Sequence, residues 1–419
     1  MVVASAAALL ATFIAAAFVY AASAGELDRS FGHHGRVVPW GVRANVTSTD
    51  IGRKGRIVVA GTHRKDFMVA RLRRDGKLDR SFSKDGVASI PTDYVKAGTT
   101  AVAIAPGGAA LVAGKACNHR GDICHVTVFR LRPDGELNRR FGDRGRVRID
   151  FGRQGQTEPS VALARHGRIL VKTTDCAAGG SGDCRVGVAR LRADGSFDNT
   201  FGEHGKTVTP IFYRARGRCA ARFRAPGDST STMALDSRGR IVVLLSCAKT
   251  ANPALARFKP NGDLDRSFGN GGTVFKEAHM GAVTALATDA RDRIDVAGSK
   301  PNGFAVVRFQ PNGKRDHSFG KDGMATAGFA RDPTSEPVPF SIALDSRGRI
   351  AAGGWISFGP DHTNAGAFAR FKPNGHVNRR FGRRGTKIVD RGLNFVDSIS
   401  IDSRDRIVGA GDAVVRLLG

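Results

Sequence analysis

The stretch NGDLDRSFGNGG, Asn261 to Gly272, decides the fold of this chain. It opens with an Asn-Gly turn signal, passes through the apolar Phe268 between charged residues, and ends in a second group of glycines. Nearly the same stretch occurs seven times in the 419 residues, so the chain is built from repeats. The recurring phenylalanines are Phe31, Phe82, Phe141, Phe201, Phe268, Phe319 and Phe381, followed four residues later by Gly35, Gly86, Gly145, Gly205, Gly272, Gly323 and Gly385.

Two further signals recur with the same sevenfold frequency. One is a hairpin such as ALDSRGRIVV (Ala234 to Val243), in which alternating apolar residues flank a tight turn. The other is a short apolar strand that ends in arginine, such as VARLRRDG (Val69 to Gly76). The recurring strand arginines are Arg71, Arg130, Arg190, Arg257, Arg308, Arg370 and Arg416.

These signals predict four strands in every repeat. The hairpin supplies strands A and B, the arginine strand is C, and the Asp-Gly or Asn-Gly pair leads into an outer strand D. Apolar residues at helical spacing are absent from the repeats, and successive phenylalanines lie 51 to 67 residues apart. We therefore predict an all-β, seven-bladed β-propeller of four-stranded blades, a fold that suits repeats of this length.

The two ends of the repeat region complement each other. The segment Gly25 to Phe31 is interpreted as a D strand without its A, B and C, and Val414 to Gly419 as a C strand without its D. Pairing them would remove an exposed edge and close the ring. We therefore predict one propeller domain over 25–419, with the N-terminal strand completing the last blade.

Residues 1–24 differ from the rest of the chain. They contain no charged side chain, are mostly apolar, and end in Ala22, Ser23 and Ala24, which fits a signal peptidase site. A basic segment before the apolar stretch is missing, and about 20 apolar residues could also remain as a membrane anchor. Both interpretations place the body outside the cytoplasm, secreted or at the cell surface, and cleaved export is favoured.

The repeats resemble the bacterial delta-60 repeat family. The resemblance rests on DGELNRRFGDRG (Asp134 to Gly145) and ALDSRGRIVVLL (Ala234 to Leu245), and it covers the whole chain after residue 24. It implies a propeller fold and export, but no shared activity. Ser83 in place of the usual glycine and Ala109 in place of the hairpin arginine depart from the pattern.

Residues present in all seven repeats are expected to serve the fold, because one binding site does not require seven copies. The phenylalanines should anchor each outer strand against the neighbouring blade. The strand C arginines should pair with a carboxylate or with backbone carbonyl groups, and the Asp-x-x-Gly turns should be capped by the Asp side chain. Function is therefore expected where the repeats differ.

Six cysteines in an exported chain predict disulfides. Cys117 and Cys124 bracket one B–C connection, and Cys176 and Cys184 bracket another. Cys219 lies in a D–A insertion and Cys247 ends a strand B, so the topology brings these two together on the same face. Zinc bound by Cys117, His119, Cys124 and His125 is the less favoured alternative. The predicted disulfides are Cys117–Cys124, Cys176–Cys184 and Cys219–Cys247, each contributing about 2–3 kcal/mol by loop closure.

The longest insertion lies on the face formed by the B–C and D–A connections. Pro210 to Thr230 interleaves arginines with aromatic residues, which suits binding of phosphate, sulfate, carboxylate or sugar rings. A solvated loop held by Cys219 is the alternative. The candidate ligand-binding residues of this face are Tyr213, Arg214, Arg216, Arg218, Arg222, Arg224, His119, Trp40 and Trp355.

The opposite face carries hairpin turns rich in arginine. A ring of such turns could attract a polyanion, and the net charge of +27 gives this idea weight. Many of these arginines have an Asp neighbour, however, and exposed ion pairs bind little. The turn arginines are Arg238, Arg240, Arg291, Arg293, Arg347, Arg349, Arg404 and Arg406.

Two functions remain open on this evidence. The first is a non-catalytic binding or scaffold propeller that associates with an anionic envelope or matrix polymer, namely an acidic polysaccharide, a teichoic acid or lipid head groups. The second is a secreted hydrolase or lyase that cleaves an anionic glycan, for which carboxylates or histidines of several blades should converge near the axis. Known catalytic motifs are absent from the sequence. We expect a monomer that uses no cofactor or metal and meets no nucleic acid in its normal compartment.

Overall fold

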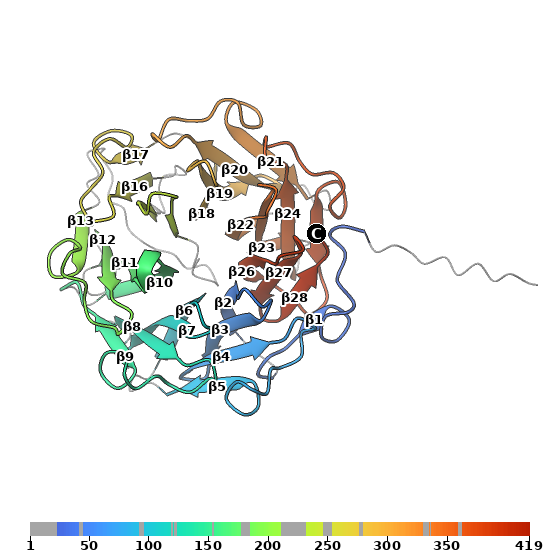
Figure 1. Ribbon diagram of the computed structural model, residues 1–419. Helices are drawn as coiled ribbons and strands as arrows, with labels where there is room; N and C mark the ends of the chain where they lie inside the picture. Colours follow the sequence, from blue (N-terminus) through green and yellow to red (C-terminus); the bar gives the residue numbers. More distant parts are fainter. Residues whose placement is uncertain are drawn as a thin grey trace, which may run out of the picture.

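The chain forms a closed ring of seven four-stranded antiparallel blades (Figure 1). The structure is a computed structural model. The residues that it describes are 23–41, 45–91, 96–118, 120, 124–152, 155–176, 185–210, 232–245, 254–275, 280–329, 335, 337–358 and 363–419. The predicted all-β propeller is confirmed, since the only helical element among these residues is the short 3-10 turn η1 (Arg165–Gly167).

Each blade runs from an inner strand A at the axis to an outer strand D at the rim. Strands A are β2 (Asn45–Ile51), β6 (Lys96–Ile104), β10 (Gly155–Leu163), β14 (Met233–Leu235), β18 (Val283–Thr288), β22 (Val338–Leu344) and β26 (Val396–Ile401). Strands B are β3 (Ile57–His63), β7 (Ala110–Cys117), β11 (Ile169–Cys176), β15 (Ile241–Leu245), β19 (Ile294–Lys300), β23 (Ile350–Phe358) and β27 (Ile407–Gly411).

Strands C and D complete the seven blades, which we number I to VII in chain order from β2. Strands C are β4 (Asp66–Leu72), β8 (Cys124–Leu131), β12 (Arg185–Leu191), β16 (Ala254–Phe258), β20 (Gly303–Phe309), β24 (Thr363–Phe371) and β28 (Val414–Leu417). Strands D are β5 (Val87–Ile90), β9 (Arg146–Ile149), β13 (Lys206–Pro210), β17 (Thr273–Phe275), β21 (Met324–Gly328), β25 (Thr386–Val389) and, for blade VII, β1 (Arg36–Val37).

The predicted closure of the ring is confirmed. Strand β1 pairs antiparallel with β28, where Arg36 lies opposite Val415. The N–H of Gly25 donates to the carbonyl of Leu418 at 2.9 Å, and Gly25 has the positive φ of +86° that the turn glycines of the other blades share. Residues 23–25 therefore take the place of the C–D turn in blade VII, and the ends of the described chain meet there.

One boundary of the sequence-based prediction was wrong. The segment Gly25 to Phe31 is not strand D but the connection that leads to it; Leu27 makes only an isolated bridge to Leu417. In every blade strand D begins at the residue directly after the recurring glycine, as Val87 follows Gly86. The glycine turns the chain at positive φ, so that the pleat can start only behind it.

A buried arginine clasp holds neighbouring blades together. In blade I the guanidinium of Arg71 donates to Asp79 at 2.9 Å and to the carbonyl of Pro133 in the C–D turn of blade II. The same guanidinium lies 4.8 Å from the ring centroid of Phe82, whose side chain is fully buried. The prediction that the strand C arginines pair with carboxylates or backbone carbonyls is therefore confirmed. A comparable stacking distance is found for Arg190, Arg257, Arg308, Arg370 and Arg416.

The recurring phenylalanine packs against the turn glycine of the next blade. A Cβ at Gly76 would stand 2.9 Å from Cδ2 of Phe31 and 2.6 Å from the nitrogen of Gly32, and φ at Gly76 is +82°. Both the backbone conformation and the close contact therefore require glycine. The predicted anchoring of the outer strand against the neighbouring blade is confirmed, and the Asp-Gly and Asn-Gly turns belong to the interface between blades.

Inner strands are joined around the axis by hydroxyl groups. The hydroxyl of Ser48 accepts a hydrogen bond from the N–H of Val102 at 3.1 Å, and that of Ser398 accepts from the N–H of Thr49 at 3.2 Å. A register shift precedes each of these serines, which gives the side chain the reach to the next blade. These hydrogen bonds link the described strands A of blades VII, I and II.

Acid is expected to weaken the arginine clasps. Burial alone would raise the pKa of Asp198, but hydrogen bonds from Thr200 and Arg168 and the charge of Arg190 lower this pKa to about 2, from 3.8 for a free side chain. A carboxyl with a lowered pKa stabilises the folded state fully above its unfolded pKa and loses that contribution as the pH falls through its folded pKa. We expect the urea midpoint to stay constant above about pH 4.5 and to fall between pH 4 and pH 2.

Substitution Asp198→Asn supplies the control for this prediction. It should lower the midpoint at pH 7 and flatten its decline below pH 4, because the titrating group is removed. Asp28, Asp79 and Asp265 have lowered pKa values as well, so a residual decline should remain. An identical pH profile for the variant and the native chain would contradict the assignment.

Candidate anion-binding face

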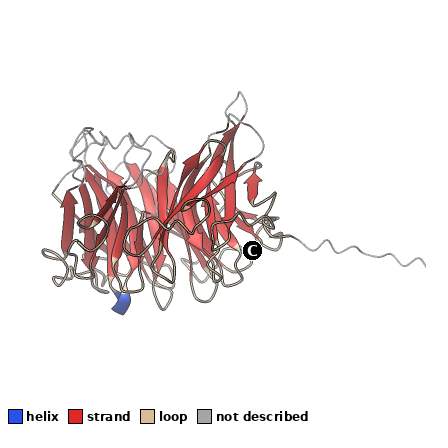
Figure 2. Ribbon diagram, turned by 90° about the horizontal axis from the view of Figure 1, so that it is seen from above, coloured by secondary structure: helices blue, strands red, loops and turns tan. Residues whose placement is uncertain are grey.

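The A–B turns and the C–D connections lie on one side of the ring, which we call the turn face. In Figure 2 the strands stand upright and η1, part of the A–B turn of blade III, lies at their lower ends. These turns contain 13 Arg or Lys residues against six Asp and no Glu. The A–B turns are residues 52–56, 105–109, 164–168, 236–240, 289–293, 345–349 and 402–406.

Each A–B turn is five residues long, and its fourth residue has a positive φ. Its first residue donates its N–H to the carbonyl of the fifth, as Asp402 does to Arg406 at 3.0 Å. In blades IV to VII the first residue is Asp, and its carboxylate organises the turn. Asp402 accepts hydrogen bonds from the N–H groups of Arg404 and Arg406 at 2.9 and 3.0 Å. The predicted capping of these turns by Asp is confirmed.

The fifth residue of the turn, the closing position, is an arginine held by carboxylates. Nε of Arg406 donates to Asp402 at 2.7 Å, and a second nitrogen reaches Asp28 at 3.0 Å. The side chain of Arg406 is 15% exposed. Arg56, Arg168, Arg240, Arg293 and Arg349 make corresponding ion pairs at 2.5–2.8 Å; blade II has alanine here.

The third residue, the tip position, is exposed and cationic in most blades. Within the part of the chain that the structure describes, Arg238, Arg291, Arg404 and Lys54 have no carboxylate within 4 Å. Arg347 lies 3.5 Å from Asp405, yet its side chain is 74% exposed. In blades IV to VII the Asp of the turn thus holds the closing arginine and leaves the tip cation exposed. The expectation that neighbouring Asp residues would neutralise these arginines holds for only one of the two arginines in blades IV, V and VII, and in blade VI Asp405 also lies near the tip residue Arg347.

Two further carboxylates tie adjacent turns together. Asp292, at φ +61°, accepts hydrogen bonds from the N–H and hydroxyl of Ser237 at 2.7 and 3.0 Å. Asp405 accepts from the hydroxyl of Ser346 in the same way at 2.9 Å. These two carboxylates therefore link neighbouring turns, and Asp405 in addition lies 3.5 Å from the tip residue Arg347.

The turns surround the mouth of the central channel. Leu344 and Thr288 line the channel, and the next residue of each chain segment starts an A–B turn. The channel hollow has a volume of about 380 Å³, and its described lining consists of aliphatic and hydroxyl side chains from all seven blades, such as Val102 and Ser398. Among the described residues, no ionisable side chain belongs to this lining.

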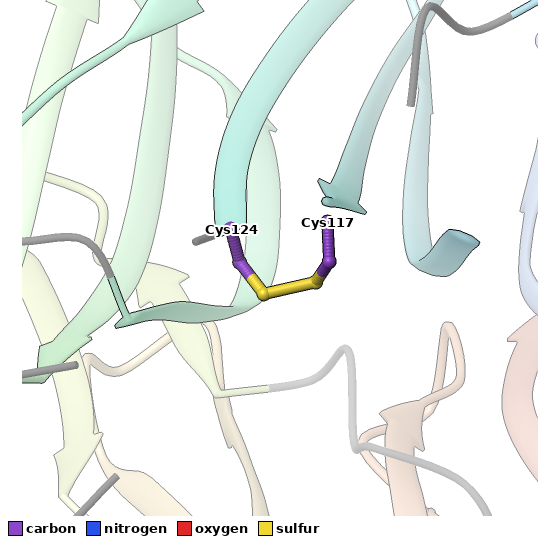
Figure 3. The surroundings of a disulfide bond; sticks show 2 residues. All are labelled: Cys117 and Cys124. Carbon is purple, nitrogen blue, oxygen red and sulfur yellow. A yellow bond between two sulfur atoms is a disulfide. The ribbon is translucent and has the colours of Figure 1, made fainter. Parts of the chain in front are cut away.

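A disulfide closes the B–C connection of blade II. Cys117 and Cys124 lie opposite each other on β7 and β8, with Cα atoms 4.1 Å apart and sulfur atoms 2.07 Å apart (Figure 3). Sulfurs joined to each other do not serve as thiolate ligands, which disfavours the zinc alternative. Among the described residues no group of three His, Cys, Asp or Glu could hold a metal ion. The other two predicted disulfides involve Cys184, Cys219 and Cys247, which lie outside the described residues.

Most of the ligand-binding residues that the sequence predicts on the opposite face lie outside the residues that the structure describes. This holds for Tyr213, for the five arginines of 214–224 and for His119. Trp40 follows β1 and packs against the core between blades VII and I, while Trp355 lies on β23 opposite Val338. Both indoles are half-buried, and their N–H groups have no acceptor among the described residues. The structure does not bring these two residues to the turn face.

Comparison with known proteins agrees with this architecture. A family model described as "Domain of unknown function (DUF5122) beta-propeller" matches residues 55–82, 177–201 and 248–268. These matches support a β-propeller repeat architecture for the chain. Among curated protein sequences none matches it. In the described residues, no helix is long and apolar enough to cross a membrane.

Two solved structures illustrate how general the fold is. A catalytically inactive variant of virginiamycin B lyase from Staphylococcus aureus, with quinupristin, is 11% identical, with a TM-score of 0.52, covering 92% of this chain and 98% of that chain. The WD40 repeats of RRP9 are 12% identical with a TM-score of 0.50, covering 92% of this chain and 97% of the other. One is an enzyme and the other a WD40 repeat domain, so this propeller's likeness to them shows the fold alone.

Proposed function

We propose that the protein is an exported, non-catalytic propeller that binds an anionic polymer of the envelope or matrix through its turn face. One observation carries this proposal: in blades IV to VII the Asp of the A–B turn pairs with the closing arginine, while the tip cation stays exposed. A ring of such cations raises the local concentration of a polyanion at the channel mouth. The resemblance to the delta-60 repeat supports export, in which case acidic polysaccharides and teichoic acids are the polymers at hand.

Retention of the purified protein on polymer fractions across a salt series tests the proposal. The native protein should be retained at low ionic strength and released as the salt concentration rises, because the exposed cations are screened. Replacing the five tip cations Lys54, Arg238, Arg291, Arg347 and Arg404 by Gln should weaken retention at least about tenfold, in line with about 1.4 kcal/mol lost.

A control variant with the same charge change separates the ring from net charge. Gln replaces five exposed cations of the C–D connections that have no ion pair in the described structure: Lys77, Arg80, Arg266, Lys314 and Lys321. This variant should lose less than half as much binding as the ring variant. Equal losses would contradict a site at the channel mouth, and no retention of the native protein at any salt would overturn the proposed function.

The two arginines of a single turn should respond differently to substitution. Arg406→Gln removes ion pairs to Asp402 and Asp28, so it should lower the free energy of unfolding by about 1–3 kcal/mol. Arg404→Gln removes an exposed, unpaired side chain and should change that free energy by less than about 0.5 kcal/mol. Urea unfolding of the two variants tests whether Arg406 stabilises the fold while Arg404 does not, and equal destabilisation would contradict this assignment.

A further inference from the structure

The C–D connection of blade VI differs from all the others in charge. Residues 372–385 read KPNGHVNRRFGRRG and contain five Arg or Lys and no Asp or Glu. The corresponding connection of every other blade carries two or three acidic residues. In blade II, for example, RPDGELNRRFGDRG has the same Asn-Arg-Arg-Phe-Gly core but includes Asp134, Glu136 and Asp143.

The structure shows how blade VI holds its arginine clasp without this carboxylate. In blade I the clasp arginine pairs with Asp79 of the C–D connection; the corresponding residue of blade VI is Asn378. Here the guanidinium of Arg370 instead donates to Asp345 of the A–B turn, and both side chains are 0% exposed. Because the structural anion comes from another turn, the C–D connection keeps its cations without neutralisation.

These cations stand on a rigid backbone. The fully buried Phe381 donates its N–H to the carbonyl of Asn378 at 2.9 Å and accepts from the N–H of Gly385 at 2.8 Å. Gly382 donates to the carbonyl of Ala24 at 2.8 Å, which ties the connection to blade VII. Within the described structure no carboxylate pairs with the exposed side chains that this backbone presents, which are Lys372, Arg379, Arg380, Arg383 and Arg384.

The cations gather along a hollow that extends from the turn face along the side of blade V. It has a volume of about 1680 Å³ and runs from Ala327 on strand D of blade V to Gly419 at the C-terminus. Four of the five exposed cations line it, together with His376 and Arg349; none of its lining residues has a carboxylate side chain, and the one carboxylate at the hollow is the terminal group of Gly419. Arg349 is held by Asp345 and Asp405, so the others remain free for a ligand.

We infer that this hollow, the blade VI seat, binds phosphate or sulfate groups of the polymer. The inference rests on the proposed function and assigns the strongest contact between the protein and the polymer to this hollow. Guanidinium groups donate paired hydrogen bonds that match the oxygens of phosphate and sulfate, and two Arg-Arg pairs flank one fixed Phe-Gly step. Blade II has the same Asn-Arg-Arg-Phe-Gly core together with three acidic residues, so the fold of this connection does not require that acidic residues be absent.

Matched variants of the two blades test the seat. Arg379→Gln with Arg380→Gln in blade VI is compared with Arg139→Gln with Arg140→Gln in blade II, which removes equal charge from equivalent positions. Affinity is measured by titration with long-chain inorganic polyphosphate and with dextran sulfate. We expect an affinity loss of at least about tenfold for blade VI and less than about twofold for blade II.

A second variant copies the native acids of blade II onto blade VI. His376→Glu with Arg383→Asp should abolish the preference for blade VI while the thermal midpoint stays within about 2 °C, because blade II carries these residues at the same positions. Polygalacturonate, whose anions are carboxylates, should bind more weakly and respond equally to both blade variants.

The outcomes distinguish this inference from the proposed function. Equal losses in both blades, with the native protein binding normally, would overturn the seat but leave the turn face intact. If the blade VI variant weakened binding of polygalacturonate as much as it weakens binding of polyphosphate, the assignment to phosphate or sulfate would be overturned. Failure of the native protein to bind any of the three polymers would overturn both proposals.

Discussion

A chain that begins at Val38 is expected to lose its cooperative unfolding transition. The truncation removes β1, the buried Phe31 and Asp28, which pairs with Arg416 at 2.9 Å. A buried phenylalanine accounts for about 3–5 kcal/mol, and a buried arginine without its carboxylate costs a similar amount. The loss of about 6 kcal/mol or more is of the order of the whole stability of a domain.

Thermal unfolding followed by circular dichroism checks this expectation. A chain beginning at Ser23 keeps every contact of the closure and serves as the control. The truncated chain should expose the edge of β28 and elute as an aggregate, since an unpaired strand edge recruits other chains. A truncated chain that is monomeric and melts within about 5 °C of the control would show that the N-terminal strand is dispensable for the ring.

The second large effect is expected in blade V, where the arginine clasp is built differently. Arg308 donates to both carboxylate oxygens of Asp295, at 2.7 and 2.9 Å, and both side chains are almost completely buried. Desolvation raises the pKa of Asp295. Substitution Arg308→Met leaves a buried carboxylate without its partner and should lower the free energy of unfolding by about 3–5 kcal/mol.

The reverse substitution should be much milder. Asp295 occupies the strand B position that is aliphatic in the other six blades, such as Val58 and Val242. After Asp295→Val the guanidinium of Arg308 can turn to Asp316, which stands where Asp79 holds Arg71 in blade I. We expect a loss below about 1.5 kcal/mol. Urea unfolding compares the two variants, and equal losses would contradict the asymmetry.

The architecture could be predicted from the sequence because the same Phe and Gly positions recur once in every repeat, which aligns the repeats with one another. Seven phenylalanines gave the number of blades, and the unmatched ends indicated closure. The start of strand D was misplaced because the motif of Leu264 to Phe268 has the alternation of a strand, whereas its backbone is held by one isolated bridge and a turn. Alternation alone does not separate a pleated strand from a hydrogen-bonded connection.

The candidate site was less accessible to sequence reasoning. Two arginines near one Asp look alike in the sequence, and only the turn geometry shows that Asp236 binds Arg240 and leaves Arg238 free. The spacing of four residues between Asp236 and Arg240 was the available signal. The sequence also did not show that Asp345 replaces the carboxylate that is missing at Asn378, because Asp345 takes this role only through its contact with Arg370.

The pairing of residue 28 with residue 416 also imposes an order in time. A ribosome delivers the chain from its N-terminus, so β1 is among the first strands made and its partner β28 the last. Until β28 arrives, six blades can form from neighbouring segments, while β1 has no strand to pair with in the seventh. Joining segments almost a full chain length apart is the slowest kind of contact to form. An open ring with unpaired strand edges at β1 and β27 therefore precedes the closed one.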